Sequence, residues 1–69
     1  MHKISSFPER LKELREEKDL SMNQLAKKVG VSDRAISKWE NGSASPILLK
    51  LELLADFFGV SVDYLIGRE

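Results

Sequence analysis

The chain has 69 residues, equal numbers of basic and acidic side chains (11 of each) and no cysteine. Without cysteine it can form neither a disulfide framework nor a thiolate metal site, and its balanced charge gives no overall attraction to nucleic acid. With 42% hydrophobic residues it suits one small folded domain. It lacks a run of ~20 apolar residues and a signal-peptide pattern, so we expect a cytoplasmic protein with no membrane association.

Five short helices are predicted, at about residues 7–18, 22–29, 33–41, 45–58 and 62–66. Four of them start at a serine that can accept the free amide hydrogens of a first turn: Ser6, Ser21, Ser32 and Ser61. The fourth helix is expected to open at Ser45 and Pro46 instead. No segment alternates polar and apolar residues for long enough to form a strand, so the sequence predicts an all-α fold.

The second and third helices have the pattern of two short helices that cross steeply. Ala26 supplies the small residue that a close crossing needs, and Gly30 permits a tight turn by accepting a positive φ. Ile36 and Trp39 are expected to face the core. At 100° per residue, this orientation leaves three polar residues on the outer face: Arg34, Ser37 and Lys38. Such an exposed helix face has the size to enter a DNA major groove.

Four stretches, residues 9–15, 25–32, 36–42, and 54–55 with 59–65, together resemble the phage repressor and Cro-like, XRE-type helix-turn-helix family. The resemblance covers residues 7–67, and the four stretches occur in the family's order. It implies a single domain over residues 1–69, a compact five-helix, lambda-repressor-like fold with the helix-turn-helix at about residues 22–41. It also implies a transcriptional regulator, a repressor, that binds double-stranded operator DNA as a homodimer.

The resemblance assigns roles to residues in three places. Base-edge contacts fall to the third helix and its cap: Ser32, Asp33, Arg34, Ser37 and Lys38. Phosphate contacts fall to the start of the second helix and the loop after the third: Met22, Asn23, Gln24, Asn41, Gly42 and Ser43. Arg15 and Glu40 correspond to an ion pair that orients the third helix. Arg34 is expected to discriminate most, because a guanidinium can bond guanine O6 and N7 together, whereas Lys38 suits a base or a phosphate equally. For Asp33 we favour a structural role at the helix start over a contact to cytosine N4.

Two departures from the family pattern weaken the expected grip on the DNA backbone. The second helix of the family commonly starts with glutamine, whereas this chain has Met22, whose side chain cannot donate a hydrogen bond. The loop after Gly42 is commonly basic but here contains Ser43, Ala44 and Ser45. We therefore predict modest affinity and a shallow salt dependence.

The fourth helix carries two apolar stripes. One is predicted to face the core: Leu48, Leu51, Leu54, Ala55 and Phe58. The other lies on roughly the opposite side: Leu49, Leu53 and Phe57. With Ile47 or with the Val60 to Tyr64 end (Val60, Val62 and Tyr64), this second stripe is predicted to meet a partner. The first choice of partner is a second copy, the next is a further C-terminal domain if the chain is a fragment, and the third possibility is that the first helix or the tail covers the stripe.

A rival interpretation is a protein-interaction module of the same fold that uses this stripe without reading DNA. Its support is the near-neutral charge, Met22 and the serine-containing loop. An enzyme is not expected, because the sequence contains no nucleophile-base pair and no phosphate loop. We also expect no cofactor and no metal, since no His, Asp or Glu cluster has ligand spacing.

Overall fold

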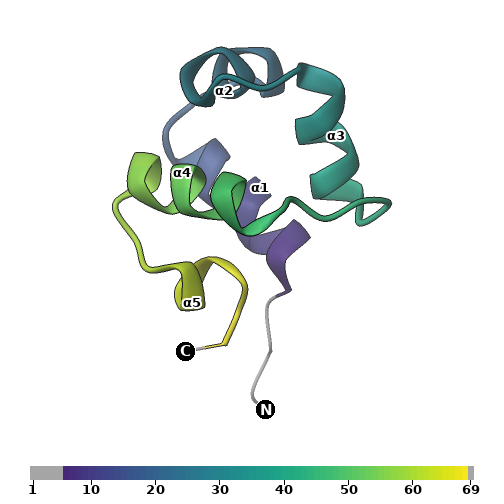
Figure 1. The fold of residues 1–69 in the computed structure, drawn as a ribbon. Coiled ribbons are helices and arrows are strands. Elements are labelled where there is room, and N and C mark those ends of the chain that lie inside the picture. Colours follow the sequence, from purple (N-terminus) through teal and green to yellow (C-terminus); the bar gives the residue numbers. More distant parts are fainter. Residues whose placement is uncertain (1–5, 69) are drawn as a thin grey trace.

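The computed structural model describes residues 6–68, which form five helices and no strand. They are α1 (Phe7–Glu17), α2 (Met22–Val29), α3 (Asp33–Asn41), α4 (Leu48–Phe58) and α5 (Val62–Leu65). In Figure 1, α2 and α3 lie together at one side, α1 and α4 cross the middle, and α5 lies at the opposite side. The predicted all-α, five-helix fold is confirmed. In this described part, no helix combines the length and the apolar character that a bilayer crossing demands.

Serine is the N-cap residue of α1, α2, α3 and α5, as predicted. The hydroxyl oxygens of Ser21, Ser32 and Ser61 accept backbone amide hydrogens at 3.0, 3.1 and 2.9 Å. Each cap satisfies one of the amides that a first helical turn leaves free, a contribution of about 1 kcal/mol. Gly30 ends α2 with a φ of +77°, a conformation that favours glycine, so the turn to α3 is tight as the sequence predicts.

The core takes one fully buried aliphatic side chain from every helix. These five residues are Leu11, Leu25, Ile36, Leu54 and Leu65. Burying each of them is worth about 1.5–3 kcal/mol, so each helix is held by its own core residue. The third helix packs mainly against α2 and α1, and α4 packs against α5 and α2. The position of α3 is therefore determined by two helices at once.

The start of α4 differs from the prediction. The helix begins at Leu48 rather than at Ser45 and Pro46, and its N-cap residue is Ile47, which has no side-chain acceptor. Leu48, expected in the core, is 62% exposed. It lies on the same side of α4 as Ala55, seven residues later, but at the very start of the helix, where the other helices do not cover it. Because α4 is apolar on nearly all sides, its periodicity could not show where coverage ends.

Candidate nucleic-acid interface

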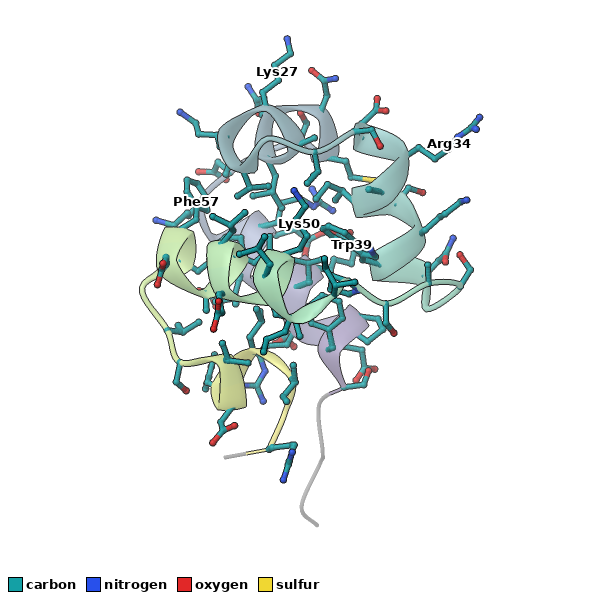
Figure 2. The ribbon with its side chains drawn as sticks, viewed as in Figure 1. Lys27, Arg34, Trp39, Lys50 and Phe57 are labelled. Atoms are coloured by element: carbon teal, nitrogen blue, oxygen red, sulfur yellow. The ribbon has the colours of Figure 1, made fainter. Side chains whose placement is uncertain are left out.

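The outer face of α3 carries the polar residues expected there. Ile36 is fully buried and Trp39 is 7% exposed, so both anchor the helix to the core. Arg34 and Lys38 are exposed and Ser37 is half-buried. Figure 2 shows Arg34 pointing away from the body of the protein and Trp39 pointing into it. The predicted orientation of α3 is confirmed, and within residues 6–68 neither Arg34 nor Lys38 forms an ion pair.

The first turn of α3 has a mainly structural part to play. Ser32 accepts the amide hydrogen of Ala35 at 3.1 Å, so its oxygen is already engaged, although its hydroxyl hydrogen can still be donated. Asp33 is exposed at the amino end of the helix, where a carboxylate is favoured by the helix dipole. The cations Arg34 and Lys38 therefore remain as the main groups available to a ligand.

A shallow groove between α2 and α3 brings a predicted phosphate residue next to predicted base-contact residues. Its lining residues are Met22, Asp33, Arg34, Ser37 and Lys38. Met22 packs partly against the core and is half-buried. Its side chain therefore lies beside the surface from which α3 would contact bases. A second shallow hollow, beside α2, is lined by Gln24, Lys27 and Lys28.

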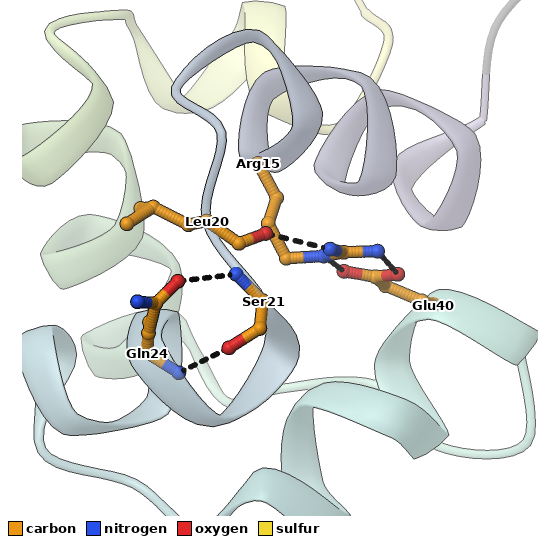
Figure 3. Close-up of polar contacts among 5 residues, drawn as sticks. All are labelled: Arg15, Leu20, Ser21, Gln24 and Glu40. Carbon is orange, nitrogen blue, oxygen red and sulfur yellow. Dashed lines mark hydrogen bonds and ion pairs between the residues drawn. The ribbon is translucent and has the colours of Figure 1, made fainter.

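The start of α2 offers two free backbone donors. Ser21 and Gln24 form a reciprocal capping box, in which the Ser21 amide donates to Gln24 Oε1 at 2.8 Å and the Gln24 amide donates to Ser21 Oγ at 3.0 Å (Figure 3). In the described part of the chain, the amides of Met22 and Asn23 donate to no acceptor. Free amides at a helix start are suited to a phosphate oxygen. Met22 can therefore contribute its amide, though not its side chain, to phosphate binding.

The loop after α3 is largely occupied by its own hydrogen bonds. The Ser43 amide donates to Asn41 Oδ1 at 2.8 Å and to the Lys38 carbonyl oxygen at 3.0 Å, and the Gly42 amide also donates to Lys38. The predicted phosphate donors that remain here are the Asn41 side-chain amide nitrogen and the Ser43 hydroxyl, both on exposed residues. The loop after α3 therefore offers side-chain donors but no lysine or arginine.

The ion pair between Arg15 and Glu40 is present and bidentate. Arg15 Nε and Nη2 donate to the two Glu40 carboxylate oxygens at 2.6 and 3.0 Å, and Nη1 donates to the Leu20 carbonyl oxygen at 2.8 Å (Figure 3). Only 11% of the Arg15 side chain and 4% of the Glu40 side chain are exposed. The hydrogen bond to Glu40 raises the pKa of Arg15 above its already high ordinary value, so the guanidinium is protonated at neutral pH. One guanidinium thus joins α1, the segment leading into α2, and the end of α3.

Arg10 is a second buried arginine that our sequence analysis missed. Its Nη1 donates to the Tyr64 carbonyl oxygen at 3.2 Å, and its guanidinium carbon lies 4.0 Å from the centre of the Tyr64 ring. It therefore fastens α5 to α1. The available signal was its spacing, because Arg10 precedes the core residue Leu14 by four positions and so shares its face of α1.

The predicted partner surface is only partly exposed. Leu49 and Leu53 are exposed, whereas the other members pack against the core and are half-buried: Phe57, Val60, Val62 and Tyr64. The large apolar residues that are exposed lie instead just before α4 and in its first half. We call this group the apolar α4 face, and it consists of Ile47, Leu48, Leu49 and Leu53.

Comparison with known proteins agrees with this geometry. The family model described as helix-turn-helix matches residues 11–65 of the chain. The protein belongs to the XRE-type helix-turn-helix family. Among solved structures of this type, the P22 c2 repressor in complex with a synthetic operator has a TM-score of 0.87 to this chain. It is 32% identical, and the match covers 94% of this chain and 98% of that one.

Curated members of the helix-turn-helix family are similar over nearly all of this chain. The transcriptional activator BcrR of Enterococcus faecalis is 43% identical over 63 residues, which are 91% of this chain and 31% of BcrR. The cryptic phage CTXphi transcriptional repressor RstR of Vibrio cholerae is 35% identical over 61 residues, which are 88% of this chain and 55% of RstR. The chain thus spans between about a third and just over half of the length of these relatives.

Proposed function

We propose that the chain is a sequence-specific DNA-binding domain of a transcriptional regulator, with α3 in the major groove. The observation that carries this proposal is the arrangement of α3. Arg34 and Lys38 project freely while Ile36 is fully buried beneath them. The likeness to a repressor solved on a synthetic operator supports the same assignment. The role is one of binding rather than catalysis, and it is exercised where the DNA is, in the cytoplasm.

Each part of the surface has its own task in this proposal. Arg34 bonds a guanine through O6 and N7, and Lys38 reaches a neighbouring base edge or a phosphate. The free amides of Met22 and Asn23 bind a phosphate on one side of the groove. The Asn41 and Ser43 side chains bind a phosphate on the other side of the groove. The two phosphate contacts together set the register of α3 on the DNA. Occupying the DNA in this way is sufficient for repression when the site overlaps a promoter.

The protein is further proposed to act as a homodimer through the apolar α4 face. Ile47, Leu48 and Leu49 are each more than half exposed, and Leu53 is 40% exposed. Four exposed large apolar side chains within seven residues leave apolar surface on a 69-residue chain, and covering it with a second copy would gain free energy. A twofold dimer places two α3 helices on half-sites about one helical turn, ~34–36 Å, apart.

Selection from a pool of random duplexes tests the proposal directly. We expect an enriched inverted repeat, and we expect the Arg34→Ala/Lys38→Ala double variant to enrich nothing although it folds normally. The affinity for the enriched site should fall only shallowly with salt, by about 0.9 log units per log unit of salt for each phosphate neutralised, because few cations are available. No enrichment at low salt would contradict DNA reading and favour a protein-interaction module that uses the apolar α4 face. A steep salt slope would contradict the predicted weak backbone contacts.

A further inference from the structure

Met22 is the one apolar side chain that lines the groove between α2 and α3. The other lining residues are polar or charged: Asp33, Arg34, Ser37 and Lys38. Part of Met22 packs against the core, which restricts where the side chain can go. The rest is exposed toward the groove, since the residue is only half-buried. A thioether thus lies among the groups that would meet base edges.

The chemistry of the major groove indicates what this side chain can recognise. Base edges there present hydrogen-bond donors and acceptors, for which Arg34 and Lys38 are suited, and one apolar group, the thymine 5-methyl. Methionine can bond to none of the polar groups in any useful way. Its unbranched, polarisable side chain adapts well to a small apolar neighbour. A methyl group is therefore the only feature of the groove that Met22 can read.

The two halves of Met22 fit this role together. Its backbone amide is free at the start of α2 and suited to a phosphate, while its side chain lies beside Arg34 on the groove. A phosphate held by the amide would fix the distance between α2 and the DNA backbone. The side chain of the same residue would then meet the edge of a nearby base pair at a repeatable position. Met22 alone would thus contact both the DNA backbone, through its amide, and a base pair, through its side chain.

We infer that Met22 is a specificity-determining residue that contacts the 5-methyl group of a thymine, in the base pair next to the one bonded by Arg34. This inference rests on the proposed DNA-binding function. Met22 then distinguishes thymine from cytosine by a methyl group rather than by a hydrogen bond. Burial of one methyl group corresponds to about a fourfold change in affinity.

A methyl-deletion scan tests the inference with the duplex recovered by selection. Each thymine is replaced in turn by deoxyuridine, which removes the 5-methyl and keeps the base-pairing groups. For the wild-type protein we expect one position in each half-site at which the replacement weakens binding about fourfold. Met22→Gln keeps a side chain of similar length but should bind both duplexes equally, and Met22→Ala should do the same. Met22→Leu should retain most of the methyl dependence, and Lys12→Ala, at an exposed site on α1, should retain all of it.

The outcomes separate this inference from the function on which it rests. If a duplex is enriched but no thymine shows methyl dependence, or if the dependence persists in Met22→Gln and Met22→Ala, the inference is overturned and DNA binding stands. If no duplex is enriched, the proposed function itself fails. Thermal melting of each variant identifies any loss of folding, and Met22→Leu and Met22→Gln keep the test decisive if Met22→Ala unfolds.

Discussion

The α2–α3 side and the α4 side of this domain are built on different principles. The α2 and α3 helices each begin at a serine cap, and α3 is fastened to α1 by a nearly buried ion pair. The α4 helix begins at Ile47 without a polar cap and leaves Leu48 and Leu49 more than half exposed. Directional hydrogen bonds fix one side, while the other keeps apolar surface uncovered.

The contrast relates local chemistry to the task that we propose for each side. A helix that reads base edges must be held in one orientation, and bidentate charged pairs and caps provide directional constraints that apolar packing does not. An interface between copies gains its free energy from apolar area and tolerates more variation in geometry. Substitutions on the α2–α3 side should therefore change stability and DNA binding. Substitutions on the α4 side should change self-association.

The largest expected effect comes from breaking the ion pair. Glu40→Ala leaves the Arg15 guanidinium nearly buried without its carboxylate, which should lower the free energy of unfolding by about 3 kcal/mol. Urea unfolding measures this change. Arg15→Met/Glu40→Leu is the matched control, because it removes both charges and should recover most of the stability. An unfolding midpoint that Glu40→Ala leaves unchanged would contradict a role of the pair in holding α3.

Arg34→Ala should have the next largest effect, and on DNA binding alone. Loss of a bidentate contact to guanine costs about 2 kcal/mol, or about thirtyfold in affinity, at one base pair of the selected site. Because Arg34 is exposed, melting should stay unchanged. Arg34→Lys keeps the charge but loses the fork geometry, so it should lose discrimination while retaining non-specific binding. If wild type and Arg34→Ala discriminate equally between base pairs at every position of the site, Arg34 does not contact a base.

Charging the apolar α4 face should affect association and leave the fold intact. Leu49→Lys/Leu53→Lys should raise the dimer dissociation constant at least tenfold, because it replaces buried apolar area with like charges on both copies. Sedimentation measures the change. Glu52→Lys changes an exposed charge on the same helix outside the apolar α4 face and should have little effect. A wild-type protein that stays monomeric at high concentration would eliminate this interface.

The smallest expected effect is a gain in stability on the α4 side. Ile47→Ser supplies the cap that α4 lacks, at a residue whose φ of −71° and ψ of 165° match those of the capped helices. In the monomer, measured at a concentration too low for the proposed dimer, we expect an increase of about 0.5–1 kcal/mol, seen as a melting temperature a few degrees higher. Ser32→Ala should lower stability by a similar amount. If Ile47→Ser destabilises the protein, the Ile47 side chain has a packing role that its 67% exposure does not indicate.

The same contrast explains which features sequence reasoning could predict. The serine caps and Gly30 act through their own local chemistry, so the bounds of α2 and the start of α3 follow from residue type and spacing. Leu48 could not be placed in this way, and the spacing of Arg10 could indicate its face of α1 but not its partners. Whether Leu48 is covered depends on how far the other helices extend, and Arg10 is buried by a ring and a carbonyl that come from the far end of the chain. Three-dimensional packing decides both.

The three bonds of Arg15 have one further consequence. Since a single guanidinium holds Glu40 on α3 and the Leu20 carbonyl before α2, neither helix can tilt without disturbing the other. We therefore expect α2 and α3 to keep the same relative orientation on every DNA duplex. Any adjustment of groove width or curvature must then be made by the DNA, so base pairs that no side chain touches should influence binding through how easily they bend.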